Sequence, residues 1–349
     1  MATDLFARIP KAELHLHLDG SLRPQTALDL ARERGLDEGM DLAAMTARLQ
    51  APARVVDQAE LLRAFELPIA LLQDAPAIER VTHELVEDIA GDGTRYAEIR
   101  WGPALHIRGG LDLRASIAAV VAGARSGMAA TGITIRLIAV ALRSHLPDLN
   151  LAVALEAARF IDDGLTGFDL AGPEQQFPDP LLNHDAFDAA RRAGLGITIH
   201  AGEWGGAAQV RRALDAVSPA RIAHGAPAAQ DEDLMRELKT RGVTLDLCPS
   251  SNLQASLFPT AAEFPLARLL RSGVPVTLST DDRTVSDLTL VSEYELVHSA
   301  MGVSVAELWQ MNLHALRVAF LHHDEPLRAR LIAEFEAFAA AEPALSARS

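Results

Sequence analysis

The chain has 349 residues, 49% of them hydrophobic, and a formal net charge of −15. This length suffices for a large buried core and exceeds the usual size of one domain unless the fold is an α/β barrel. The negative charge argues against nucleic acids and anionic membranes as partners. The sequence has no run of eighteen uncharged apolar residues, no secretory signal pattern and a single cysteine, Cys248, so we expect a cytoplasmic protein without disulfides.

The first predicted strand contains the stretch ELHLHLDG at 13–20. Residues two apart on a strand point to the same face, so His15 and His17 share one face and the intervening leucines take the other. A metal ion and a polar pocket both explain such a pair. The two histidines alone leave both explanations open.

About 75 residues separate the first predicted strand from the second, more than one crossover helix needs. Within this stretch, apolar residues recur at helical intervals over 59–74. They are Leu61, Leu62, Phe65, Ile69 and Leu72. The segment is either a helix that packs its apolar face on the body of the protein or a lid, with Leu62 and Phe65 forming an apolar roof over a substrate.

Short apolar runs followed by polar or glycine-bearing turns recur along the chain. They lie at 12–20, 94–103, 133–145, 165–174, 196–203, 221–225, 243–252 and 274–282. Helical stretches such as 179–194 and 231–242 lie between them, and the second of these ends at a glycine stop signal. The alternation predicts a (β/α)₈ TIM-type barrel, an α/β fold, as one domain over 1–349.

After the last predicted strand, 304–321 and 326–343 read as additional amphipathic helices on the outside of the barrel. The histidines of the C-terminal region lie in helical context, and we expect them to be structural. They are His298, His314, His322 and His323.

Polar residues gather where four of the predicted strands end, and barrel enzymes carry their active sites at this face. They are His15, His17 and Asp19, then His200 and Glu203, then His224, and finally Asp281 and Asp282. Three imidazoles and one carboxylate suit Zn²⁺, which lowers the pKa of a bound water to about 7. This donor set predicts His15, His17, His200 and Asp281 as the metal ligands.

The two lysines, Lys11 and Lys239, do not lie at the C-terminal end of any predicted strand. A carbamylated lysine that bridges two metals is therefore excluded, and we expect one Zn²⁺ per chain. Glu203 and His224 remain for proton transfer. We expect His224 to take or orient the proton of the water, and a protonated Glu203 to act as the donor. The alternatives are a surface carboxylate and a buried, hydrogen-bonded histidine, and Cys248 is expected to be structural.

The motifs PKAELHLHLDGSL, FDLAGPE, HAGE, AHG and STDD occur in this order over nearly the whole chain. Together they resemble the adenosine deaminase family of metal-dependent amidohydrolases. The resemblance implies hydrolysis of an adenine-type 6-amino group, with His15, His17, His200 and Asp281 as zinc ligands. It implies that Glu203 donates a proton to ring nitrogen N1 and that His224 positions the attacking hydroxide.

The same resemblance implies three substrate contacts. Asp282 would bond N7, the backbone N–H of Gly172 would meet N3, and Asp19 with His17 would lie near a ribose hydroxyl. The sequence departs from the family pattern at Arg283, where proline is familiar. Arg283 either pairs with Asp281 or Asp282, or reaches into the cleft and binds an anionic group of the substrate.

The leading prediction is therefore a zinc-dependent deaminase of adenosine or 2′-deoxyadenosine. The alternatives are a deaminase of an anionic nucleoside such as aminodeoxyfutalosine, or of free adenine. A non-catalytic nucleoside-binding relative is a hypothesis of another class. We expect a small-molecule purine nucleoside as the partner, and the sequence carries no prediction of the oligomeric state.

Overall fold

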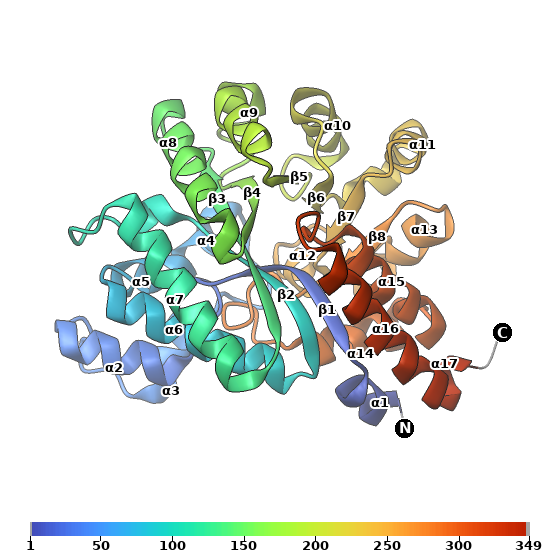
Figure 1. Cartoon of the computed structure of the whole chain (residues 1–349), viewed down its shortest axis with the longest axis horizontal. Coiled ribbons are helices and arrows are strands. Elements are labelled where there is room, and N and C mark those ends of the chain that lie inside the picture. The colour runs from blue at the N-terminus through green and yellow to red at the C-terminus, as the bar shows by residue number, and fades with distance from the viewer. Residues whose placement is uncertain (1, 347–349) are drawn as a thin grey trace.

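The computed structural model describes residues 2–346, and strands at its centre are surrounded by helices (Figure 1). Eight parallel strands pair in chain order, from β1 to β8. They are β1 (Lys11–His17), β2 (Thr94–Trp101), β3 (Thr134–Leu142), β4 (Leu165–Ala171), β5 (Gly196–Ala201), β6 (Arg221–His224), β7 (Thr244–Leu247) and β8 (Val276–Leu278). This is the predicted (β/α)₈ barrel.

The barrel closes between its first and last strands, at the level of the predicted metal ligands. Leu16 and Asp281 form a parallel bridge. The His17 N–H donates to the Asp281 carbonyl at 2.7 Å, and the Asp281 N–H donates to the His15 carbonyl at 3.0 Å. Asp281 has a φ of 67°. Strand β8 ends at Leu278, before the predicted run over 274–282 does.

The helices surround the strands and continue beyond the last one. They are α1 (Ala2–Arg8), α2 (Pro24–Arg34), α3 (Leu42–Leu49), α4 (Gln58–Leu62), α5 (Glu66–Leu71), α6 (Ala75–Gly91), α7 (Leu113–Thr131), α8 (Pro147–Ala157), α9 (His184–Ala193), α10 (Gly206–Val217), α11 (Glu232–Arg241), α12 (Pro249–Gln254), α13 (Leu266–Arg271), α14 (Leu290–Ala300), α15 (Val305–Val318), α16 (Glu325–Ala341) and α17 (Pro343–Ser346). The helices predicted after the last strand are present as α15 and α16. Helix α11 ends at Gly242, whose φ of 66° is the left-handed conformation of a glycine stop.

Short 3₁₀ helices complete the described chain. They are η1 (Arg63–Phe65), η2 (Pro103–Leu105), η3 (Ala158–Asp163), η4 (Pro180–Asn183), η5 (Ala226–Gln230) and η6 (Ala261–Glu263). Among the helices that the structure describes, none is long and apolar enough to cross a membrane.

The segment predicted as one helix over 59–74 is instead built from α4, η1 and α5. Proline explains the interruption, because Pro68 lacks an N–H and its ring obstructs the carbonyl four residues earlier, that of Ala64. Ala64 lies in the 3₁₀ turn. The predicted helical spacing therefore identified the segment and its apolar residues correctly, but not its continuity.

Strand β1 shows the predicted alternation. Leu14, Leu16 and Leu18 belong to the main hydrophobic core and are fully buried. His15 is also fully buried, and its ring meets those of His200 and His224, which come from β5 and β6. One face of β1 thus contributes to the apolar core, and the other places imidazoles inside the barrel mouth.

Candidate active site

The ring nitrogens of three histidines converge on one carboxylate at the mouth of the barrel. His17 Nε2 lies 3.3 Å from His15 Nε2 and 3.2 Å from His200 Nε2. Asp281 Oδ1 lies 3.0 Å from His15 Nε2 and 3.4 Å from His17 Nε2. Burial lowers the pKa of His15 well below its ordinary value and that of His17 to about 3. Both rings therefore stay neutral and present nitrogen lone pairs.

These separations fit a zinc ion. Ligand atoms about 2.0–2.1 Å from a tetrahedral zinc lie about 3.3–3.4 Å from one another. The separations His15–His17, His17–His200, His15–Asp281 and His17–Asp281 are 3.3, 3.2, 3.0 and 3.4 Å, which is close to this size. Ligand atoms of His15, His200, Asp281 and additionally His224 also lie within 4.8 Å of one another. The donor set thus suits a metal ion, and His224 stands next to it.

A buried carboxylate supports the outer nitrogen of one predicted ligand. His200 Nδ1 lies 2.9 Å from Asp169 Oδ2, and Arg100 Nη1 donates to the same oxygen at 2.9 Å. Partners of this kind fix the ring orientation of metal-binding histidines. Asp169 lies in the FDLAGPE motif, two residues before the end of β4, but the sequence analysis gave it no role.

The turn after β7 supports two further site residues. Ser251 Oγ donates to Asp281 Oδ2 at 2.6 Å, and Asn252 Nδ2 lies 3.1 Å from His224 Nδ1. Both residues lie in the CPSSN stretch, on the short helix α12. Neither residue was predicted from the sequence, although their place directly after a strand at the C-terminal end of the barrel was a usable signal.

Glu203 and His224 face each other at the edge of this cluster. His224 Nε2 lies 3.9 Å from Glu203 Oε2 and 3.8 Å from Asp281 Oδ2. Burial, reinforced by the Asp281 carboxylate, raises the pKa of Glu203 to about 8. Glu203 thus carries a proton at neutral pH. Burial lowers the pKa of His224, so its ring is neutral there.

The loop that carries Glu203 is held by another buried acid, Glu174. Its carboxylate accepts hydrogen bonds, each of 2.8 Å, from the backbone N–H groups of Gly202, Trp204 and Gly205. Gly202 has a φ of 80°, which favours glycine at this turn. The acid at the end of the FDLAGPE motif therefore fixes the HAGE turn, a second support that sequence reasoning did not identify.

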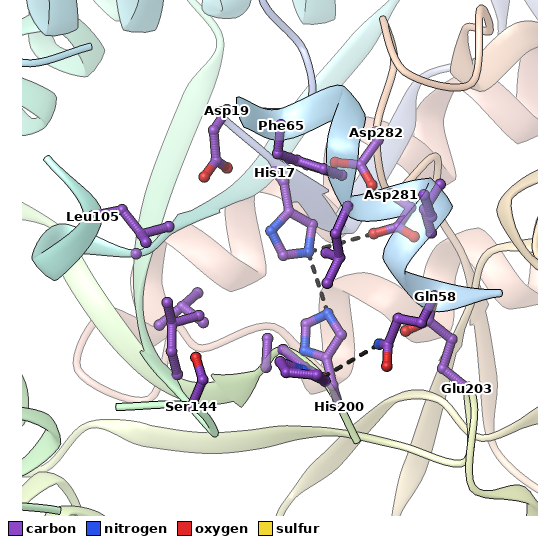
Figure 2. Close-up of a pocket in the computed structure, with 18 of the residues that line it drawn as sticks. His17, Asp19, Gln58, Phe65, Leu105, Ser144, His200, Glu203, Asp281 and Asp282 are labelled. Carbon is purple, nitrogen blue, oxygen red and sulfur yellow. Dashed lines mark hydrogen bonds and ion pairs between the residues drawn. The ribbon is translucent and has the colours of Figure 1, made fainter. Parts of the chain in front are cut away.

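A cavity of about 260 Å³ opens above the histidine cluster, and Figure 2 shows part of its lining. Residues predicted to contact substrate line it together with the catalytic candidates. They are Asp19, Leu62, Phe65, Gly172, Glu203, His224, Asp281 and Asp282. Leu61 and Ile69 also line it. The interrupted segment 58–71 therefore lies over the barrel mouth, which agrees with the lid interpretation.

Both interpretations of Arg283 are wrong. Its Nη2 pairs with Glu13 Oε2 at 2.8 Å and its Nη1 with Asp92 Oδ2 at 2.7 Å, and it does not line the active-site cavity. Asp281 and Asp282 follow β8, but the Arg283 side chain joins Glu13 on β1 to Asp92 after α6. Arg283 thus forms buried internal ion pairs, and it neither pairs with Asp281 or Asp282 nor reaches into the cavity.

Other residues have contacts outside the cavity. His298 Nδ1 lies 2.9 Å from the Val303 carbonyl, and His314 Nε2 lies 3.0 Å from Thr244 Oγ1. His322 and His323 both contact the Gly194 carbonyl. Cys248 is a buried free thiol. None of these residues lines the active-site cavity in the part of the chain that the structure describes.

Comparison with known proteins gives a consistent result. Residues 10–337 match the adenosine deaminase family. An adenosine deaminase from Clostridium perfringens is 36% identical over 314 residues, covering 89% of this chain and 94% of that protein. An adenine deaminase from Rhizobium meliloti is 38% identical over 328 residues, covering 94% and 98%.

Solved structures agree with this assignment. An adenine deaminase from Arthrobacter aurescens superposes with a TM-score of 0.86 at 27% identity, covering 95% of this chain and 99% of that one. An amidohydrolase from Burkholderia ambifaria with bound zinc also has a TM-score of 0.86 at 27% identity, covering 97% and 94%. Arabidopsis ADAL complexed with IMP has a TM-score of 0.82 at 28% identity, covering 94% and 96%. The chain belongs to the adenosine deaminase family, and it is a hydrolase that deaminates adenine-type substrates.

Proposed function

We propose that this enzyme is a zinc-dependent deaminase of adenosine and 2′-deoxyadenosine, which converts each to the 6-oxo nucleoside and ammonia. The observation that carries the proposal is the composition of the cavity. One part of the cavity is lined by the histidine and carboxylate cluster at the barrel mouth. Another part is lined by uncharged and acidic hydrogen-bonding groups, and an apolar lid lies over both.

The lining favours a substrate without negative charge. Among the described residues, no lysine or arginine lines the cavity, whereas Asp19, Glu203, Asp281 and Asp282 do. Away from the proposed zinc ligands, a phosphate or carboxylate would meet Asp19 and no cationic side chain, which is unfavourable in a buried site. This opposes nucleotides, and it opposes aminodeoxyfutalosine, the carboxylated alternative.

A second set of polar side chains favours a nucleoside over the free base. Asp19, Gln58 and Ser144 line the same cavity. In Figure 2, Asp19 and Ser144 lie on the side of the cavity away from Glu203. Burial raises the pKa of Asp19 to about 6, so its carboxyl is mostly ionised at neutral pH and can accept a hydrogen bond from an uncharged hydroxyl group. A ribose offers hydroxyls to such groups, and free adenine does not.

The remaining roles follow from protonation and position. Glu203 donates its proton to N1 while the oxygen of water bonds to C6, and the C6–N bond to the amino group then breaks. Of the two protons of the water, one leaves with the amino group as ammonia and the other restores the Glu203 carboxyl. Burial raises the pKa of Asp282 well above its ordinary value, and its Oδ1 has no hydrogen-bond partner within residues 2–346. A protonated Asp282 therefore suits N7, an acceptor. The N–H of Gly172, which also lines the cavity, suits N3.

One Zn²⁺ per chain, held by His15, His17, His200 and Asp281, would make a water nucleophilic at neutral pH. The Asp281→Asn variant tests this ligand set. Asparagine tolerates the left-handed backbone of Asp281, so the fold should persist while the anionic ligand is lost. We expect zinc measured by elemental analysis to fall from one per chain to well below one, together with turnover. Stoichiometric zinc in this variant would remove Asp281 from the ligand set.

Ultraviolet spectroscopy of the zinc-loaded enzyme tests the substrate, because loss of the 6-amino group changes the purine spectrum. Adenosine, 2′-deoxyadenosine, adenine, AMP and aminodeoxyfutalosine would be compared by kcat/KM. We expect the two neutral nucleosides to exceed the other three by at least about a hundredfold. Preference for free adenine, as the name of the Rhizobium meliloti relative suggests for that protein, would overturn the nucleoside assignment.

A further inference from the structure

Asn252 carries information about where the proton of His224 resides. Asn252 is fully buried on α12, and its Nδ2 lies 3.1 Å from His224 Nδ1. An amide nitrogen only donates hydrogen bonds, so Nδ1 of the ring must be the acceptor. A neutral imidazole that accepts at Nδ1 carries its single proton at Nε2.

The other edge of the ring supports the same tautomer independently. His224 Nε2 faces Asp281 Oδ2 at 3.8 Å and Glu203 Oε2 at 3.9 Å. The protonated Glu203 can donate or accept, but the ionised Asp281 carboxylate only accepts and favours a proton on the nitrogen that faces it. The reverse orientation of the Asn252 amide would place its oxygen against Nδ1, and the Nε2 lone pair would then face the Asp281 carboxylate. The two edges of the ring thus agree on Nε2–H.

His224 is confined by its surroundings and has an unusual backbone conformation. His224 has a φ of 65°, an uncommon conformation for a residue with a side chain, and it is 1% exposed. The neighbouring Ser251 anchors Asp281, which faces His224 Nε2, and Asn252 itself contacts Nδ1. Two adjacent residues of α12 therefore hold the groups on both sides of the ring. A turn that anchors two site residues is a positioning device rather than part of the core packing.

We propose that Asn252 is a positioning residue that holds neutral His224 in its Nε2–H tautomer. His224 then donates a hydrogen bond to the oxygen of the attacking water and orients it, and does not act as the acceptor of its proton. Of the two roles that the sequence allowed for His224, this selects orientation. The inference rests on the proposed function of the site, since the water attacks only in the deamination.

Nitrogen NMR tests the tautomer directly. Zinc-loaded enzyme labelled with ¹⁵N-histidine would be recorded without substrate, and the signals missing from a His224→Gln variant would identify His224. We expect a protonated Nε2 and an unprotonated Nδ1. A protonated Nδ1 would overturn the proposal. Because no turnover is involved, the outcome is readable even if adenosine proves not to be the substrate, so the two proposals fail separately.

Substitutions then test whether Asn252 sets the tautomer. In Asn252→Asp a carboxylate faces Nδ1 and should draw the proton there. We expect kcat to fall about 10- to 100-fold, as for other residues that orient site groups, with KM changed by about threefold or less. Asn252→Leu, of similar size and without a donor, should lower kcat in the same direction. If Asn252→Asp does not fold, Asn252→Leu and the wild-type tautomer decide the proposal.

Asn312→Asp is the matched control, because Asn312 is an equally buried amide at the opposite end of the barrel. Its Oδ1 accepts from the Ala12 N–H at 2.8 Å and its Nδ2 donates to the Pro10 carbonyl at 2.6 Å. This variant should lose stability and keep both the His224 tautomer and kcat. An equal loss of kcat in Asn312→Asp and Asn252→Asp would reduce Asn252 to a structural residue and overturn the proposal.

Discussion

The barrel interior buries polar groups at two levels, and the two levels differ in how these groups are paired. At the lower level, Arg221 contacts Glu98 and pairs with Asp246 Oδ2 at 3.0 Å. Tyr96 donates to Glu98 Oε1 at 2.7 Å, and Thr277 donates to Asp246 Oδ1 at 2.7 Å. Every carboxylate oxygen of this floor cluster, defined as Glu98, Arg221 and Asp246, has a partner.

The mouth of the barrel lacks this completeness. Asp282 Oδ1 and Asn252 Oδ1 are buried without hydrogen-bond partners among residues 2–346, and three histidine Nε2 atoms converge where they cannot all be satisfied by one another. Leaving buried polar atoms unpaired costs free energy, so they persist where a ligand supplies the missing partner. In these two clusters, the fully paired carboxylates have a structural role, and the unpaired polar atoms of the mouth lie where a ligand can reach them.

The largest effect should come from the mouth. Glu203→Gln keeps the shape of the side chain and removes its transferable proton. Turnover should fall about 10²- to 10⁴-fold, the usual contribution of a general acid. Zinc content and thermal midpoint should stay at the wild-type values, since Glu203 is outside the proposed ligand set. Steady-state kinetics and elemental analysis check this, and near-wild-type turnover would contradict the donor role.

The floor cluster should show the reverse pattern. Arg221→Met would leave Glu98 and Asp246 buried without their cation, and breaking such a pair costs about 3–5 kcal/mol of unfolding free energy. Denaturant unfolding of the zinc-loaded variant measures this loss. The folded fraction should retain its kcat at low temperature. A fall in kcat as large as that of Glu203→Gln, without a loss of stability, would break the distinction between the two levels.

Glu293 separates incomplete pairing from position in the cavity, because it is an incompletely paired acid that does not line the cavity. Its Oε1 accepts from the Ser250 N–H at 3.1 Å, and its Oε2 has no partner in the described chain. Burial raises its pKa from 4.5 to about 8. The folded state therefore binds the proton more tightly than the unfolded state, and the contribution of Glu293 to stability declines as pH rises from about 4.5 to 8.

The Glu293→Gln variant should lose this decline, gaining on the order of 4 kcal/mol relative to wild type between these pH values. Unfolding curves across this range, with zinc in constant excess, measure the difference. Glu307→Gln is the control, because hydrogen bonding to Arg271 lowers the pKa of Glu307 to about 2, outside the window. An identical pH slope in wild type and Glu293→Gln would show that Glu293 stays ionised when folded.

The sequence predicted which residues meet at the barrel mouth far better than it predicted their partners. The structure brings His15, His17, His200 and Asp281 together, and this meeting was predictable because the C-terminal ends of barrel strands share one face. Arg283 was misassigned because its partner Glu13 lies 270 residues earlier and becomes its neighbour only when β8 closes against β1. Asp169, Glu174 and Asn252 were missed for the same reason, since contacts across strands depend on register.

The smallest effect should come from this misassigned arginine. Arg283→Lys keeps the charge but loses the fork that reaches both Glu13 and Asp92, which should cost about 1 kcal/mol of unfolding free energy. Arg23→Lys is the control, because Arg23 pairs with Asp88 on a partly exposed surface and should cost less. Because Arg283 lies outside the cavity, kcat/KM for adenosine and for aminodeoxyfutalosine should change by the same factor, about twofold or less. A loss confined to the carboxylated nucleoside would restore Arg283 as an anion-binding residue, and would require its pair with Glu13 to open when substrate binds.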